Sequence, residues 1–139
     1  MSSVSDSLAR LASEIGPLLI AKGWTLATAE SCTGGLMGHA ITNISGSSAY
    51  FKGGIISYAN EVKQRLLSVP EEMLAARGAV SREVALQMAR GARAALETDV
   101  AIAATGVAGP LGGTPAKPVG TVYVAVSSPL GEYCEHYVW

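Results

Sequence analysis

The chain has 139 residues, of which 49% are hydrophobic and 15% charged, and its formal net charge is −1. This composition excludes an intrinsically disordered chain, which requires low hydrophobicity and high net charge. Because ten basic residues face eleven acidic ones, the sequence also argues against an electrostatic nucleic-acid binder and a polybasic membrane-surface module. No apolar run reaches the roughly 18 residues of a membrane span. We therefore expect a single cytoplasmic domain over residues 1–139.

The first half of the chain is predicted to alternate helices with strands. The predicted elements, in chain order, are a helix over 5–22, a strand over 24–29, a helix over 34–44, a loop over 45–48, a strand over 54–59 and a helix over 61–67. Ser5 or Asp6 is expected to cap the first helix and Gly23 to end it, while Asn60 is expected to cap the helix over 61–67.

The second half continues this alternation and ends in a hairpin. Its predicted elements are a short helix from Pro70 to about Gly78, a helix over 82–97, a strand over 99–104, a long loop over 105–120, and strands over 121–126 and 132–138. Alternating strands and helices predict an α/β fold, a three-layer α/β/α sandwich with a mostly parallel, mixed sheet. Because the sequence ends on an apolar strand, we expect that the closing C-terminal helix of such a sandwich is lacking.

Three predicted strands are each followed by a polar or glycine-rich segment. These segments are residues 30–35, 58–63 and 105–110. In open parallel sheets, ligands bind outside the carboxyl ends of the strands. If the strands are parallel, all three segments open onto the same edge, and this edge is the predicted site.

Residues 30–35 contain two candidate nucleophiles. Ser31 lies on a strand-to-helix turn, and the amides of Gly34 and Gly35 begin a helix that could hold an oxyanion or a phosphate. The alternative interpretation is a turn whose hydroxyls only cap the helix. Cys32 is the rival nucleophile, because a helix N-terminus lowers the pKa of a thiol, although a lone intracellular cysteine is more often packing material.

Lys63 is a candidate general base. In the first turn of a helix, the helix dipole and desolvation both favour the neutral amine that a base must be. A serine–lysine pair can activate a serine without histidine. The alternative is a solvated surface lysine. Tyr58 could relay a proton or orient the lysine, or it could be half-buried packing.

Other motifs carry weaker signals. The loop over 105–120 is rich in glycine, but it lacks the Gly-Lys-Ser/Thr of a phosphate-binding loop and the helix-entering pattern of a dinucleotide fingerprint. No carboxylate lies at a spacing from His39 or His136 that would indicate a catalytic pair. Both histidines are therefore interpreted as structural, and a Ser-His-Asp triad is poorly supported. Cys32 and Cys134 form no metal-ligand spacing.

Taken together, six ordered blocks resemble one known family. The blocks are AESCTGG at 29–35, GSSAYF at 46–51, YANEVK at 58–63, GAVS at 78–81, TGVAGP at 105–110, and GGTP followed by KPVGTV over 112–122. They resemble the CinA C-terminal domain family, also called the competence/damage-inducible protein C-terminal domain. The resemblance runs from about residue 8 to the end of the chain.

This resemblance implies a three-layer α/β/α fold and nicotinamide mononucleotide deamidase activity. Such an enzyme hydrolyses the carboxamide of nicotinamide mononucleotide to nicotinic acid mononucleotide and ammonia, in pyridine nucleotide (NAD) salvage, with no metal and no cofactor. Ser31 would be the nucleophile and Lys63 its base, with Tyr58 assisting proton transfer. The residues implied to bind the substrate or its oxyanion are Glu30, Thr33, Gly34, Gly35, Ser48, Asn60, Thr105 and Gly106.

Two departures from the family pattern keep an alternative open. Leu111 stands where the glycine-rich loop usually carries an acidic residue, and the family's Gly-Asp-Arg-type turn and closing helix do not follow the last strand. The alternative function is a non-catalytic mononucleotide-binding or regulatory module. The expected partner in either case is a small-molecule pyridine mononucleotide, with no nucleic acid and no membrane, and a homo-oligomer is expected from the low net charge and apolar composition.

Overall fold

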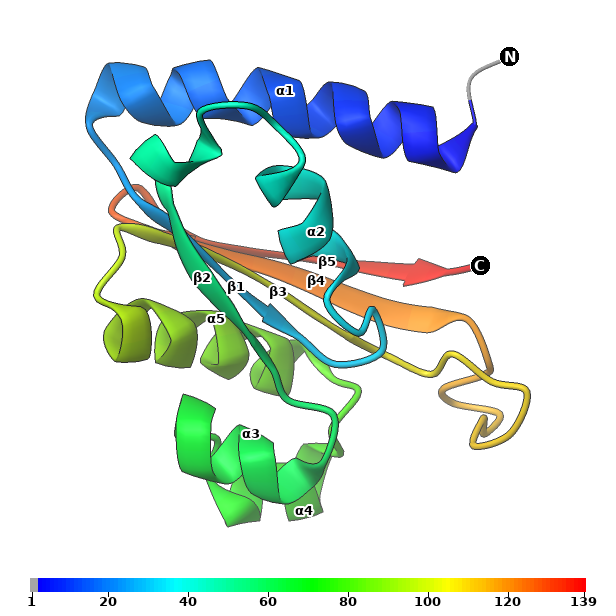
Figure 1. The fold of residues 1–139 in the computed structure, drawn as a ribbon. Coiled ribbons are helices and arrows are strands. Elements are labelled where there is room, and N and C mark those ends of the chain that lie inside the picture. Colours follow the sequence, from blue (N-terminus) through cyan, green and yellow to red (C-terminus); the bar gives the residue numbers. More distant parts are fainter. Residues whose placement is uncertain (1–2) are drawn as a thin grey trace.

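A computed structural model describes residues 3–139 and shows three layers built around one five-stranded sheet (Figure 1). The strands are β1 (Leu26–Glu30), β2 (Phe51–Ile56), β3 (Val100–Gly106), β4 (Thr121–Ser128) and β5 (Gly131–Val138). Their order in the sheet is β2-β1-β3-β4-β5. β1 pairs in parallel with β2 and β3, whereas β4 is antiparallel to both β3 and β5. The predicted α/β class, mixed sheet and final hairpin are confirmed.

Helices cover both faces of the sheet. On one face lie α1 (Val4–Lys22) and α2 (Leu36–Thr42), and on the other lie α3 (Asn60–Leu67), α4 (Glu71–Arg77) and α5 (Arg82–Leu96) (Figure 1). A short 3-10 helix, η1 (Ser47–Ala49), precedes β2. Both parallel connections are helical crossovers, which is the usual way to join parallel strands. Within residues 3–139, no helix has both the length and the apolar character needed to cross a bilayer.

The main hydrophobic core lies between the sheet and α5. Its fully buried members include Ala27 and Ala29 of β1, Ala101 and Ala103 of β3, and Val84, Ala85, Met88 and Ala89 of α5. Side chains alternate along a strand, so the intervening Thr28 and Glu30 of β1 face α2 instead. The two faces of β1 therefore carry different chemistry, which decides where each candidate residue lies.

Two predicted helix starts are wrong. The N-cap of α1 is Ser3 rather than Ser5 or Asp6: the Ser3 hydroxyl accepts from the Asp6 amide at 3.1 Å, and the Asp6 carboxylate accepts from the Ser3 amide at 3.2 Å. This reciprocal pair is a capping box, in which Asp6 acts three residues inside the helix. In α3, Ala59 holds the N-cap position and Asn60 is the first helical residue, without a side-chain cap.

The second strand lies three residues before its predicted position. β2 spans Phe51–Ile56 rather than 54–59, because residues 57–59 leave the sheet. The amide of Ser57 still donates to the Glu30 carbonyl at 2.7 Å. The carbonyls of Ser57 and Tyr58, however, accept from a lysine side chain and not from a neighbouring strand.

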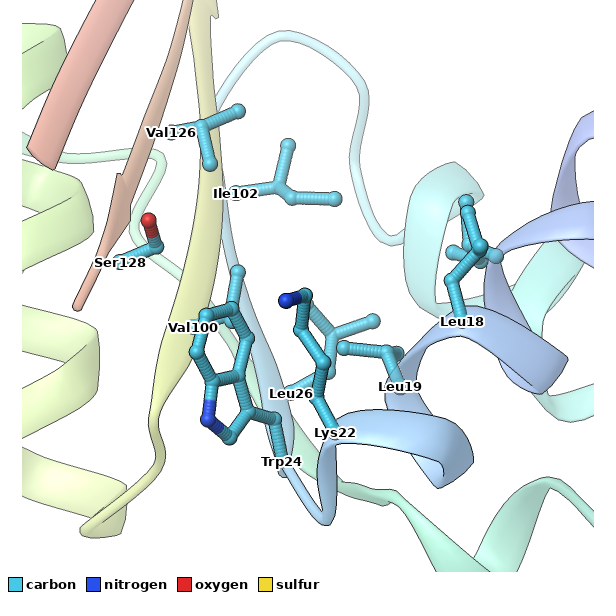
Figure 2. A pocket seen from close by; sticks show the side chains of 10 residues that line it. Leu18, Leu19, Lys22, Trp24, Leu26, Val100, Ile102, Val126 and Ser128 are labelled. Atoms are coloured by element: carbon cyan, nitrogen blue, oxygen red, sulfur yellow. The ribbon is translucent and has the colours of Figure 1, made fainter. Parts of the chain in front are cut away.

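An apolar hollow of about 270 Å³ lies between the end of α1 and strands β1, β3 and β4 (Figure 2). Leu19 of α1 and Ile102 of β3 contribute to its walls. Lys22 is the single ionisable residue in its lining, and its Nζ lies 5.0 Å from the centre of the Trp24 ring. The one serine in this lining, Ser128, donates its hydroxyl to the Gly131 carbonyl at 3.3 Å and is not paired with Lys22, so the candidate chemistry has to be sought elsewhere.

Candidate functional site

The carboxyl ends of the three parallel strands meet at one edge of the sheet, as predicted. Ser31 follows β1, Ser57 follows β2 and Val107 follows β3. The Ser31 amide donates to the carbonyl of Ala104 in β3 at 3.0 Å, and the Ser57 amide donates to the carbonyl of Glu30 at 2.7 Å. These backbone bonds tie the three strand ends together before the chain turns away.

Ser31 and Lys63 are brought together at this edge. Lys63 Nζ lies 3.0 Å from Ser31 Oγ, and it also donates to the carbonyls of Ser57 at 2.6 Å and Tyr58 at 3.1 Å. Lys63 is 1% exposed and Ser31 is 7% exposed. Desolvation lowers the pKa of Lys63 below its usual value, and the charge of nearby Cys32 opposes this shift to a smaller extent.

The hydrogen-bonding capacity of the three neighbours of Lys63 Nζ is compatible with the neutral form of this amine, which is the form that acts as a base. Two of them are carbonyl oxygens, which can only accept hydrogen bonds. A neutral amine has two N–H groups and one lone pair, so it donates to the two carbonyls and accepts from the Ser31 hydroxyl. An ammonium would instead donate to all three. The form that burial favours is therefore also the form that directs a lone pair at the Ser31 proton.

The structure places Tyr58 and Cys32 differently from Lys63. The Tyr58 side chain is 79% exposed, and it is the Tyr58 carbonyl, not the phenol, that contacts Lys63. A role for the phenol in proton transfer stays a prediction. Cys32 is half-buried, and burial raises the pKa of its thiol. Because the thiolate is the nucleophilic form, this environment does not favour Cys32 as the reactive group.

A hollow of about 220 Å³ opens at the same edge of the sheet, between the residues that follow β1 and β2 and the loop after β3; Cys32, the residue after Ser31, is in its lining, whereas Ser31 and Lys63 are not. It is lined by Cys32, Tyr58, Gly106, Val107, Ala108, Gly109 and Leu111. No charged side chain belongs to this lining. The hollow therefore suits an uncharged group.

Glu30 lies under the start of α2 and not in this hollow. Its carboxylate is 2% exposed; Oε1 accepts from the Thr33 hydroxyl at 2.7 Å, the Gly35 amide at 3.2 Å and the Met37 amide at 2.9 Å, and Oε2 accepts from the Gly38 amide at 3.0 Å. The expectation that Glu30 and Thr33 contact the substrate is not supported by this arrangement. They hold the turn that carries the nucleophile.

Neither Gly34 nor Gly35 has an amide free for an oxyanion. The Gly34 amide donates to the Ser31 carbonyl at 3.2 Å, and the Gly35 amide is one of the donors to Glu30. Both glycines have positive φ, 62° and 106°, a conformation that favours glycine. The helix predicted over 34–44 therefore begins only at Leu36.

The amides of Cys32 and Thr33 are different. Within residues 3–139, neither donates a hydrogen bond to an oxygen. Both lie near the Cys32 sulfur, where they lower the pKa of the thiol by less than burial raises it. They are the backbone donors that directly follow Ser31 and have no oxygen acceptor among the described residues.

The remaining predicted residues divide between the site edge and other places. Gly106 lines the hollow, and Asn60 begins α3 at the same edge. The Thr105 hydroxyl donates to the Ala79 carbonyl at 2.9 Å, so it joins β3 to another loop. Ser48 lies away from Ser31 and Lys63 within this chain, because η1 precedes β2 and so lies at the opposite, amino end of the strand; its contact with a substrate stays a prediction.

Both histidines lie on the surface and contact residues other than Ser31 and Lys63. His39 is on α2, with its Nε2 3.2 Å from Asn43 Nδ2, and His136 stacks on Tyr123 with ring centres 4.5 Å apart. Across residues 3–139, no three His, Cys, Asp or Glu side chains gather in an arrangement that could hold a metal ion.

Sequence reasoning missed Ser57. It contributes its backbone carbonyl to Lys63 at 2.6 Å, and its hydroxyl donates to the Glu30 carbonyl at 3.2 Å. Every residue type has a backbone carbonyl, so this contact could not be predicted from the identity of residue 57. The only available signal was the position of Ser57 directly after a strand and six residues before Lys63.

We expect Glu30→Ala to lower the free energy of unfolding by about 3 kcal/mol, because four donors lose a buried charged acceptor. Urea unfolding of the two proteins measures this difference. Glu30→Gln keeps one acceptor oxygen, so it should lower the free energy of unfolding by less than Glu30→Ala does. Unchanged stability of Glu30→Ala would show that the carboxylate does not hold the turn.

Sequence comparisons agree with the motifs. The CinA C-terminal domain family matches residues 8–139. A relative from Moorella thermoacetica, described as competence-damage inducible, is 58% identical over 116 residues, covering 84% of this chain and 28% of the relative. A CinA-like protein from Geobacter sulfurreducens is 59% identical over 110 residues, covering 79% and 27%. The chain spans less than a third of the length of these curated relatives.

Solved structures share the fold. The competence/damage inducible protein CihA from Agrobacterium tumefaciens is 43% identical, with a TM-score of 0.89 over 99% of this chain and 82% of that one. A competence-damaged protein (CinA) superfamily protein from Escherichia coli is 34% identical, with a TM-score of 0.93 over 100% of this chain and 81% of that one. Since family, relatives and fold agree over nearly all of its residues, the chain belongs to the CinA C-terminal domain family.

Proposed function

We propose that this domain is a nicotinamide-nucleotide amidase that hydrolyses nicotinamide mononucleotide to nicotinic acid mononucleotide and ammonia. The observation that carries the proposal is the buried contact of 3.0 Å between Lys63 Nζ and Ser31 Oγ. The pair supports a serine hydrolase reaction, and the family resemblance supports the choice of substrate. A cytoplasmic location belongs to the same proposal, and the free thiols of Cys32 and Cys134 are consistent with it.

In the first half of the reaction, Ser31 forms an ester with the substrate. Ser31 Oγ attacks the carboxamide carbon while its proton moves to Lys63 Nζ, and the carbonyl oxygen becomes an oxyanion. When the C–N bond breaks, the departing nitrogen takes the proton from Lys63 and leaves as ammonia. Lys63 is neutral again, and the acyl group stays on Ser31.

In the second half, water cleaves that ester. Lys63 accepts a proton from the attacking water, and the new tetrahedral intermediate collapses as the bond to Ser31 Oγ breaks. The proton returns from Lys63 to Ser31 Oγ, and the product leaves as the carboxylic acid. Both halves need a base that begins and ends neutral, which is the state that burial of Lys63 favours.

The amides of Cys32 and Thr33 are the donors that we assign to the oxyanion. An amide that directly follows a nucleophile is well placed for this, because it lies close to the carbonyl oxygen of the group whose carbon the nucleophile attacks. Their lack of an oxygen acceptor supports the assignment, whereas the amides of Gly34 and Gly35 already have acceptors.

Ammonia release from nicotinamide mononucleotide tests the proposal. We expect Ser31→Ala to lower the rate at least ~10³-fold, because the group that forms the ester is lost. Binding of the mononucleotide, measured by calorimetry, should survive. Ser13→Ala on the exposed face of α1 is the matched control, since its hydroxyl only bonds to the Arg10 carbonyl.

Other outcomes discriminate between the hypotheses. Full ammonia release by Ser31→Ala would exclude the serine mechanism. Tight binding with no ammonia from the unaltered chain at any enzyme concentration would favour the non-catalytic module instead.

A further inference from the structure

A second hollow lies on the opposite face of the sheet from Lys63, between α2 and strands β1 and β2. It measures about 180 Å³ and is lined by Thr28, Glu30, Gly35, Gly38, His39, Thr42, Phe51, Gly54 and Ile56. We refer to it as the α2 hollow. None of its lining residues belongs to the lining of the hollow that Cys32 and Tyr58 line.

Two oxygen atoms in the α2 hollow have unused hydrogen-bonding capacity. Thr28 is 0% exposed, and its Oγ1 is the only buried side-chain polar atom of residues 3–139 without a hydrogen-bond partner. Buried polar groups normally have partners, so an orphaned hydroxyl facing a hollow indicates a missing one. Glu30 Oε2 accepts one bond, from Gly38, and a carboxylate oxygen can accept two.

Glycine keeps the space beside these two oxygens open. A Cβ added to Gly38 would lie 3.5 Å from Glu30 Oε2, 3.6 Å from Thr28 Oγ1 and 3.7 Å from Cζ of Phe51. On the other side, Thr28 Oγ1 is packed against Gly54 and fills the place that a Cβ at position 54 would take, so the space beside the two oxygens lies on the Gly38 side. One small volume is therefore within reach of a hydroxyl, a carboxylate oxygen and the edge of an aromatic ring.

We propose that the α2 hollow binds an ammonium-type cation, either ammonium itself or the head of a small primary amine. Such a group donates hydrogen bonds to both oxygens, and the Glu30 charge favours a cation over a neutral donor. The same charge disfavours an anion. A divalent metal ion is not favoured either, since no three His, Cys, Asp or Glu side chains of residues 3–139 gather in an arrangement that could hold one. One water molecule takes up about 30 Å³ of the liquid, and the hollow measures about 180 Å³, so it also has room for a few carbon atoms of an amine.

Binding here does not depend on the amidase reaction. Glu30 nonetheless links the α2 hollow to the proposed active site, because its carboxylate borders this hollow and also holds the turn that carries Ser31. A cation on Glu30 Oε2 would therefore sit one residue along the chain from the nucleophile.

The melting temperature of the full chain tests this site. It is measured during titration with the chlorides of ammonium, methylammonium, potassium and sodium at constant ionic strength. We expect a saturable rise with ammonium or methylammonium, and none with sodium or potassium. A response to ammonium alone identifies the free ion, and a larger response to methylammonium identifies an amine head. Equal responses to all four salts, or none to either nitrogen cation, would overturn the proposal.

Two variants locate the response. Thr28→Val replaces the hydroxyl by a methyl group of similar shape, and Gly38→Ala fills the hollow with a methyl group at ordinary contact distances. Both should fold and both should lose the ammonium response, whereas Thr114→Val in the exposed loop should keep it. Retention of the full response by Thr28→Val and Gly38→Ala would also overturn the proposal, because the cation would then be bound elsewhere.

Discussion

Lys63→Met is expected to lower the rate of amide hydrolysis by ~10²–10⁴-fold, the usual contribution of a general base. Methionine keeps most of the apolar stem of lysine but offers no lone pair to the Ser31 proton, which Lys63 Nζ now faces at 3.0 Å. Ammonia release measures the loss. Lys52→Met is the matched control, because Lys52 is exposed and its Nζ only donates to the Glu97 carbonyl. Unchanged turnover by Lys63→Met would exclude Lys63 as the base.

The pH dependence of the rate examines the same assignment. Only neutral Lys63 can accept the Ser31 proton, so the rate should rise with pH up to the pKa of Lys63 and then level off. Because desolvation lowers this pKa, the plateau should begin below 10.5, the ordinary value for lysine. The residual activity of Lys63→Met should lack this rise.

Unfolding measurements on the same two proteins separate folding from chemistry. In the unfolded chain Lys63 recovers its ordinary pKa, so between the folded value and 10.5 the unfolded state binds more protons. The free energy of unfolding should therefore increase with pH through this window and stay constant, as far as Lys63 is concerned, on either side of it. Lys63→Met should show no such increase.

The pairing of Ser31 with Lys63 was within reach of sequence analysis. Both follow strands that run in parallel, and parallel strands end at the same edge, so the topology alone brings the two segments together. The α/β class followed from the alternation of strands and helices in the same way. These predictions rest on periodicity and chain order, which the sequence displays directly.

Contacts made by the backbone were not predictable in this way. The carbonyls of Ser57 and Tyr58 hold Lys63, and any residue type could supply them. The end of the second strand was mispredicted because of these same backbone contacts. The sequence after Ile56 still resembles a strand, although the carbonyls of Ser57 and Tyr58 bind Lys63 and the chain has left the sheet. The contacts of Glu30 were not predictable for a related reason: its four donors, the Thr33 hydroxyl and three backbone amides at the start of α2, come together only when the turn is built.

Gly91→Ala is expected to cause a large loss of stability, about 2–3 kcal/mol, although alanine is the better helix former by ~1 kcal/mol. Gly91 lies inside α5, where an added Cβ would be 2.1 Å from the carbonyl oxygen of Leu67 and 2.7 Å from its Cα. These are backbone atoms of the last residue of α3, so no side-chain rotation can relieve the overlap. The clash therefore outweighs the gain in helix propensity.

The consequence of Gly91→Ala should extend to the site. Lys63 lies one turn before Leu67 on α3, so pushing the end of α3 away from α5 shifts Lys63 relative to Ser31. We expect lower unfolding free energy in urea and slower ammonia release at temperatures where the variant is still folded. Gly38→Ala is the matched comparison for stability, because its Cβ meets nothing closer than 3.5 Å and helix propensity should make that variant more stable. A Gly91→Ala protein as stable as Gly38→Ala would mean that α3 and α5 can separate without cost, and that the position of Lys63 is set by the strand edge alone.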